Sequence, residues 1–218
     1  MITVPEGTRR IVERSRYLSE ALSKGIINHS SLARYIQPEL ETMLIKKISQ
    51  GSIVMALKRL EAVLKPQSKI NTVFAQPPEM VIRSGLILTS IQRTRETEDK
   101  IRELFLNRIK GSITSITIGT TEITVAGTHL LTPQLKDKFA KSNFLNTCRN
   151  VSQITITLPT TAMTSPGVYY FFLKSISWEG INILGCAATA SEYTLFFEDK
   201  DINRAFEVLS SLFTKAVV

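Results

Sequence analysis

The sequence predicts an α+β protein in which a helical N-terminal part precedes two copies of a β-α-β-β-α arrangement. Apolar residues recur at helical spacing up to Lys65, and a polar stretch with three prolines then breaks the pattern. After Met80 the same order of strands and helices occurs twice, about seventy residues apart. That order is the ferredoxin-like βαββα(β) arrangement. We therefore expect a helical module over 1–66, a linker over 67–79, and two ferredoxin-like domains over 80–148 and 149–218.

Local signals define the helices of the first module. A helix is predicted from Pro5 to Gly25, where a glycine is a typical C-terminal stop, and Asn28 is a good N-cap for the next helix. Pro38 is expected in the first turn of a further helix, where its missing N–H does no harm. Ser49 begins a turn that leads into IVMALKRLEAVLK, an amphipathic helix whose apolar face predicts a buried side.

This series of short helices, ending in a basic amphipathic helix, resembles a helix-turn-helix module, with a wing or a linker around residues 70–74. In such modules the last helix lies in the major groove of DNA. The resemblance implies base-edge contacts from Gln50 and Ser52, and phosphate contacts from Lys46, Lys47, Lys58 and Arg59. A helical bundle that serves dimerisation or scaffolding fits the same pattern equally well.

The first β-α-β-β-α segment begins with the strand MVIRSGLILTSIQ. Thr94 is positioned to cap the following helix, and two alternating runs around Thr120-Thr121 predict a β-hairpin. Pro133 opens the second helix of this segment.

The second segment begins with a strand over 151–159 and continues with a helix from Pro166 to about Glu179 that Thr164 or Ser165 would cap. It ends with a hairpin and a helix that Asp199 or Asp201 would cap. The strand over 151–159 fits either the sheet of the first segment or that of the second, and we favour the second.

The second segment resembles an ACT domain, especially the paired domains at the C-terminus of aspartate kinases. The resemblance rests on ITITLP, on SPGVYYFFLKSISWEGINIL and on SEYTLFFEDKDINRAFEVL, which together span about a third of the chain. The first segment matches in element order only, because Thr94-Arg95-Glu96 stands where the second segment has its Pro-Gly turn. We therefore expect ligand binding in the second segment rather than the first.

A ligand site of the ACT type would include Ser165, Gly167, Val168 and Asn182. Gly167 at a helix start allows a ligand to approach the backbone, and the free N–H groups of the first helical turn can hold a carboxylate. Asn182 offers both a donor and an acceptor to the other polar groups of an amino acid. In ACT domains such sites often lie between two domains. The alternative is that Pro166-Gly167 only turns the chain.

The net charge of +8 is unevenly distributed. Lys and Arg outnumber Asp and Glu by 12 to 6 over residues 1–70 and by 11 to 7 over 71–150, whereas over 151–218 the acids lead by 6 to 4. A basic N-terminal part and a slightly acidic C-terminal part fit a chain with two functions. The basic part would bind an anionic partner such as DNA.

Several classes of protein are not expected. The N-terminal sequence has no apolar segment of a secretory leader and no run is apolar enough to span a membrane, so we expect a cytoplasmic protein. Cys148 and Cys186 are expected as small buried hydrophobes rather than ligands or a disulfide. No glycine-rich phosphate loop, nucleophile motif or metal-binding spacing is present, so we expect neither a cofactor nor a metal and no enzymatic activity.

The leading functional hypothesis is a regulator that senses a small molecule, most simply an amino acid, and controls DNA binding by the N-terminal module. Leucine-responsive regulators share this plan of a DNA-binding front and an ACT-like back. The alternative is a separate regulatory subunit that modulates an enzyme by protein contacts. An enzyme on a ferredoxin-like scaffold ranks last. We expect a homo-oligomer joined through the ACT-like domains.

Overall fold

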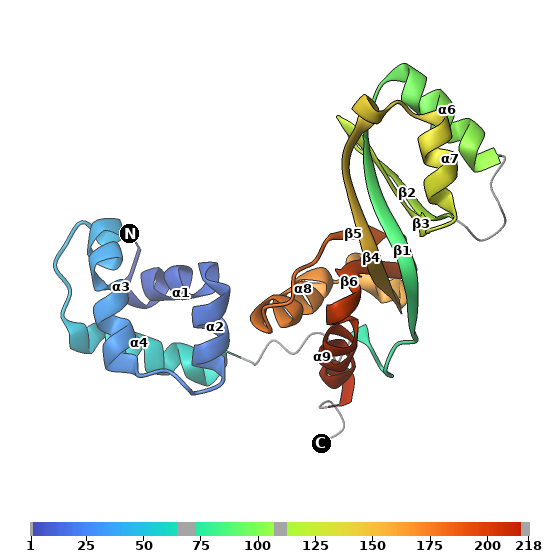
Figure 1. Ribbon diagram of the computed structural model, residues 1–218. Helices are drawn as coiled ribbons and strands as arrows, with labels where there is room; N and C mark the ends of the chain where they lie inside the picture. The colour runs from blue at the N-terminus through green and yellow to red at the C-terminus, as the bar shows by residue number, and fades with distance from the viewer. Residues whose placement is uncertain (1, 65–72, 107–112, 215–218) are drawn as a thin grey trace. The chain divides into compact units, whose positions relative to one another are not determined.

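The computed structural model describes residues 2–64, 73–106 and 113–214 (Figure 1). The chain divides into two compact units, unit one over Met1–Lys69 and unit two over Ile70–Val218. Residues 67–72 of the predicted linker lie outside the described residues, and so do residues 70–72 of the segment interpreted as a wing. Val73 and Phe74 are described, and both are buried in the core of unit two.

Unit one is helical, and its helix starts are set by local capping. The hydroxyl or amide oxygens of Thr3, Asn28 and Ser49 accept hydrogen bonds from N–H groups of the first turn. The helices are α1 (Val4–Arg14), α2 (Arg16–Ser23), α3 (His29–Leu44) and α4 (Gln50–Val63).

Two expectations for these helices are wrong. The helix predicted from Pro5 to Gly25 is interrupted at Ser15, whose backbone is extended, and the apolar spacing runs across this break without revealing it. Pro38 does not start a helix but lies inside α3, on its exposed side. The proline removes one N–H from the helix, while the Thr42 hydroxyl donates to the Pro38 carbonyl oxygen at 2.9 Å.

The core of unit one is built from one face of each helix. Fully buried side chains at the centre are Leu22, Ile36, Leu40, Ile53 and Leu57. Gly7 on α1 lies so close to α3 that a Cβ there would stand 2.5 Å from Leu40 Cδ1. A larger residue at this helix crossing would therefore force the buried Leu40 side chain to move.

Glu41 holds the connection between α3 and α4. Its Oε1 accepts hydrogen bonds from the Ile48 N–H at 2.9 Å and from Gln37 Nε2 at 3.3 Å. Both bonds favour the charged carboxylate and so lower the pKa of Glu41. The bond from the Ile48 N–H has the larger effect, and the bond from Gln37 the smaller.

We expect Glu41→Gln to lower the thermal midpoint of unit one at pH 7. Because the pKa of Glu41 is lower in the folded chain, its carboxylate stabilises the fold above the unfolded pKa, and this contribution is lost as pH falls through the folded pKa. The difference between wild type and variant, measured by thermal unfolding, should therefore shrink in acid. The exposed Glu13→Gln change is the control, and a pH-independent difference would contradict this role.

Unit two contains one antiparallel sheet with the strand order β2-β3-β1-β4-β6-β5. The strands are β1 (Met80–Gln92), β2 (Ile113–Ile118), β3 (Glu122–Thr128), β4 (Phe144–Thr157), β5 (Gly185–Ala188) and β6 (Glu192–Glu198). The helices are α6 (Arg95–Leu106), α7 (Leu131–Lys138), α8 (Val168–Trp178) and α9 (Ile202–Thr214), and short 3-10 turns cover Lys141–Asn143, Thr160–Thr164 and Asp199–Asp201.

The strand β4 belongs to both β-α-β-β-α segments. It pairs with β1 along one edge and with β6 along the other, and it runs across the expected boundary between residues 148 and 149. The strand predicted over 151–159 therefore belongs to the sheet of the first segment and to that of the second. Figure 1 shows the long strands β1 and β4 side by side, with the two segments joined in one continuous sheet.

Each pair of helices covers a different part of this sheet. Ile87, Ile91, Ile123 and Val125 pack with residues of α6 and α7. Ile154, Ile156, Leu195 and Phe197 pack with α8 and α9. Because side chains alternate along a strand, Leu86, Leu88, Val151 and Phe196 lie on the opposite faces of the same strands, where they form a third cluster.

The pairing register of β1 with β4 reveals an internal repeat between the two segments of unit two. Gly85 in β1 and Asn150 in β4 are both left-handed, with φ of 73° and 55°, and the residues that follow them, Leu86 and Val151, pair with each other. Five residues after each left-handed position a hydroxyl side chain meets a threonine of the next strand. These contacts are Ser90 with Thr124 at 3.1 Å and Thr155 with Thr194 at 2.9 Å.

The expectation for the cysteines is wrong in part. Cys148 in β4 is half-buried, but Cys186 in the edge strand β5 is exposed, and both are free thiols. The short strand β5 also begins four residues later than the stretch predicted from Ile181, so Asn182 precedes it.

Candidate ligand turn and candidate nucleic-acid face

The turn that leads from the second 3-10 segment into α8 is open. Gly167 is the N-cap of α8 with φ of 94°, and no side chain caps the helix. A Cβ added at Gly167 would meet no atom within 4 Å. The first turn of α8 therefore lacks a side-chain acceptor of its own, and the space beside Gly167 is free.

The other residues of the predicted ligand site have distinct surroundings. The Ser165 hydroxyl does not cap α8 but donates to the Thr161 carbonyl oxygen at 2.7 Å. Val168 is buried among the residues that line the core beneath α8. Tyr169 stacks edge-on against Tyr193 with ring centroids 4.7 Å apart, and burial is the main cause that raises the pKa of the Tyr193 hydroxyl.

Asn182 lies at the other end of α8. The helix has 11 residues, and it separates Gly167 at its start from Asn182 beyond its end. At 1.5 Å per residue this is about 16 Å. One copy of the chain thus brings Ser165, Gly167 and Val168 together but leaves the exposed Asn182 apart from them.

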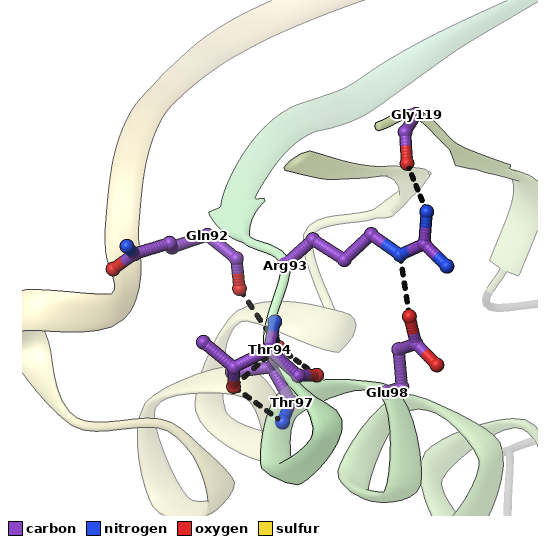
Figure 2. Close-up of polar contacts among 6 residues, drawn as sticks. All are labelled: Gln92, Arg93, Thr94, Thr97, Glu98 and Gly119. Carbon is purple, nitrogen blue, oxygen red and sulfur yellow. Dashed lines mark hydrogen bonds and ion pairs between the residues drawn. The ribbon is translucent and has the colours of Figure 1, made fainter. Parts of the chain in front are cut away.

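The equivalent turn of the first segment, between β1 and α6, is closed by its own side chains. Figure 2 shows Thr97 beneath this turn, where its hydroxyl donates to the Gln92 carbonyl oxygen at 2.7 Å. The Thr94 N–H donates to the Thr97 hydroxyl at 2.8 Å, and the Thr97 N–H donates to the Thr94 hydroxyl at 3.1 Å. This reciprocal arrangement satisfies donors that a ligand would otherwise use.

Arg93 completes the closure. Its guanidinium pairs with Glu98 on α6 and donates to the Gly119 carbonyl oxygen at 2.8 Å, as Figure 2 shows. The α6 turn is therefore tied to the β2–β3 hairpin. Of the two helix starts that follow the long strands, only that of α8 is open to a ligand.

The residues predicted to contact DNA lie on and just before α4. Lys46 and Lys47 are exposed in the connection between α3 and α4, and Lys58 and Arg59 are exposed on α4. Gln50 is tied to α3, because its Nε2 donates to the Ser30 carbonyl oxygen at 3.0 Å. Ser52 takes part in the Ser49 cap.

The exposed face of α4 combines charge with apolar surface. Lys58 and Arg59 have no ion-pair partner among the residues that the structure describes. On the same helix Met55 and Val63 are 52% and 64% exposed. This face can therefore meet an anionic partner or an apolar one.

Comparison with known proteins gives matches in structure but not in sequence. No protein family model and no curated protein matches the chain. The regulatory subunit of aspartate kinase from Thermus flavus is 10% identical with a TM-score of 0.53, and the match covers 63% of this chain and 99% of that one. Aspartokinase alpha and beta subunits give 13% identity and a TM-score of 0.52, with the same coverage.

The aspartate kinase of Clostridium acetobutylicum gives 10% identity and a TM-score of 0.53, and this chain spans only 35% of its length. These matches confirm that the chain contains an ACT-type fold like that of aspartate kinase regulatory subunits. At such low identity they show the fold alone. Within the described residues, no helix is long and apolar enough to cross a membrane.

Proposed function

We propose that this chain is a non-catalytic, cytoplasmic regulatory protein in which unit two binds an amino acid at the start of α8. The open turn at Gly167, which contrasts with the closed turn at Thr94–Thr97, is the observation that carries the proposal. The ACT-type fold shared with regulatory subunits of aspartate kinase supports a sensing role.

The chemistry of the turn suits the carboxylate of an amino acid. N–H groups of the first turn of a helix point outward and lack partners within the helix, and the helix dipole favours a negative charge there. Gly167 has no side chain to shield them. Asn182 would complete such a site only if a second copy supplied it, so we propose a homo-oligomer in which Asn182 of one chain faces the Gly167 turn of another.

A thermal-shift screen of the full chain against the twenty amino acids tests this proposal. A ligand that binds the folded state raises the midpoint by mass action, by an amount that grows with its concentration. We expect one or two amino acids to give a saturable shift that Gly167→Asp removes, because the new carboxylate would occupy the turn and repel the ligand.

Gly180→Asp is the matched control for that variant. Gly180 is also left-handed, with φ of 67°, has open space around it and follows the other end of α8. It therefore adds the same charge and the same backbone strain away from the turn. The amino-acid version of the proposal is excluded if no amino acid shifts the midpoint, or if both variants respond like the wild type.

We further propose that unit one binds DNA through α4 and the preceding connection, with Lys46, Lys47, Lys58 and Arg59 on phosphates and Gln50 and Ser52 near base edges. The net charge of the first seventy residues and the exposed cations of α4 support this role. To reach a base, Gln50 must first break its hydrogen bond to the Ser30 carbonyl oxygen. The loss of that bond offsets part of the free energy gained from the base contact.

Anisotropy of a labelled duplex, measured over a series of salt concentrations, tests DNA binding. Replacing Lys58 and Arg59 together by Gln should weaken binding by about tenfold or more and reduce the slope of log K against log salt by about 2. Lys24→Gln is the control, since this ammonium is already paired with Glu20 at 2.9 Å. An unchanged slope in the double variant would exclude α4 as the DNA-binding helix.

The second candidate function is a regulatory subunit that modulates a separate enzyme. The exposed Met55 and Val63 on α4 favour it, because apolar surface of this kind suits a protein partner. The same anisotropy series separates the two candidates. Absence of salt-dependent DNA binding, together with an intact amino-acid response, would favour the enzyme-modulating role.

A further inference from the structure

A hollow of about 390 Å³ lies where the two segments of unit two meet, and the ligand turn at Gly167 takes no part in it. Its walls come from β1, from β4 and from the junction between β3 and α7. The lining residues are Gly85, Leu86, Ile87, His129, Thr132, Lys136, Arg149 and Asn150. A volume of this size is within the usual range of sites for small molecules.

The polar groups around this hollow are cations and hydrogen-bond donors. Lys136 on α7 and Arg149 on β4 bring positive charges from two different elements, and His129 adds an imidazole N–H. No carboxylate lines the hollow, and none of these three side chains has an ion-pair partner in the described part of the chain. Cations that gather without a counter-charge in a concave site attract an anion.

Backbone features shape the hollow. The left-handed Gly85 and Asn150 interrupt the regular pairing of β1 with β4 beside the pair of Leu86 and Val151. Thr132 and Lys136 are four residues apart on α7 and therefore share one face of that helix. The hollow therefore lies between this face of α7 and the irregular part of the β1–β4 pair.

The internal repeat provides a comparison within the same molecule. A second hollow of about 560 Å³ shares Arg149 and Asn150 and is lined by Glu198, Asp199 and Lys200 from the junction after β6. Because Leu86 pairs with Thr128 and Val151 pairs with Glu198, His129 and Asp199 hold equivalent positions. In this second hollow the Glu198 carboxylate pairs with the Lys200 ammonium at 2.6 Å.

The carboxylates of the second hollow have partners of their own. Asp199 Oδ1 accepts a hydrogen bond from the Ser152 hydroxyl at 2.5 Å, and Glu198 raises the pKa of Lys200. In the second hollow Lys200 is thus paired with a carboxylate of the same lining, whereas Lys136 in the first hollow has no such partner among the described residues. The uncompensated cations are therefore a feature of the first hollow and not of every such position in the fold.

We propose that the hollow lined by His129, Lys136 and Arg149 binds a small molecule that carries a phosphate group. The guanidinium of Arg149 suits two oxygens of a phosphate at once, and Lys136 supplies a compact positive charge. Thr132 and Asn150 supply further polar groups for the remainder of the molecule. Such a ligand would bridge β4 to α7 and so join the two segments of unit two.

Calorimetric titration of the full chain with inorganic pyrophosphate, at an ionic strength held constant with sodium chloride, tests this site. Saturable binding is expected. His129→Asp, which places the residue of the equivalent position in this hollow, should weaken it by about tenfold or more, because a carboxylate repels the phosphate and pairs with the cations. Lys136→Gln should weaken it by a similar factor.

Two further arms make the result specific. Succinate, a dicarboxylate, should bind more weakly than pyrophosphate if phosphate geometry matters. Lys200→Gln removes a cation from the second hollow and should leave pyrophosphate binding within about twofold of the wild type. His129, Lys136 and Lys200 are exposed, so these variants should fold, and circular dichroism checks that they do.

The proposal fails if pyrophosphate produces no saturable heat beyond the chloride control, or if His129→Asp and Lys136→Gln bind it like the wild type. Succinate binding as tight as pyrophosphate would overturn the phosphate assignment. Pyrophosphate binding should persist in Gly167→Asp, so the result is independent of the amino-acid response at the α8 turn.

Discussion

Replacing Phe172 by Ala should lower the stability of unit two by about 3–5 kcal/mol, which corresponds to a fall in its thermal midpoint of roughly 10 °C. Phe172 is fully buried in α8. Its ring lies about equally far from Phe74, Tyr193 and Phe213, with centroid separations of 6.0, 6.1 and 6.2 Å. Truncation leaves a cavity among aromatic rings that the surrounding elements cannot close without moving.

The consequence should extend beyond the second segment. Because β4 is paired on both sides, loss of the α8 core removes the support of a strand on which the first segment also depends. Scanning calorimetry should therefore show one shifted transition for the whole of unit two, with that of unit one unchanged. Tyr170→Ala is the control, since this neighbour is 51% exposed. Separate transitions for 80–148 and 149–218 would contradict a shared sheet.

Replacing Val151 by Asp should prevent unit two from folding at all or leave it strongly destabilised. Val151 is fully buried on β4, paired with Leu86 of β1 and packed against Phe196 of β6. An unpaired charge at such a position costs several kcal/mol, a large part of the total stability of a domain. The expected result is loss of the unfolding transition of unit two, measured by near-ultraviolet circular dichroism.

The control for this change lies in the same strand. Leu145 is 55% exposed, so Leu145→Asp adds the same charge to β4 with little desolvation. That variant should keep the transition within about 1 kcal/mol of the wild type. Similar stabilities for Val151→Asp and Leu145→Asp would show that the centre of the β1–β4 pair is not buried in solution.

Much of the secondary structure was predictable because its causes are local. Asn28, Ser49 and Thr94 lie at helix starts and bond to N–H groups a few residues away, so the residues themselves carry the information. The hairpins of both segments likewise depend on neighbouring residues. The failures have equally physical causes, because neither the break at Ser15 nor the inclusion of Pro38 in α3 disturbs the apolar spacing.

The candidate site was predictable only in part. The Pro166-Gly167 motif identifies a helix start without a side chain, and the structure places Gly167 there in a left-handed conformation. Whether a helix start is open depends on distant groups. The α6 turn is closed by Arg93, which reaches Gly119 on a hairpin 26 residues away, and no local pattern predicts this contact.

The sequence by itself determined the order of strands and helices in unit two, the helix caps at Asn28, Ser49 and Thr94, and the Pro-Gly turn, because these follow from interactions within a few residues. The tertiary structure alone decided that β4 pairs with both β1 and β6, and that His129, Lys136 and Arg149 line one hollow. Periodicity specifies which face of a strand is buried but not which strand lies beside it. Groups brought together by pairing between distant strands are therefore found only in the folded chain.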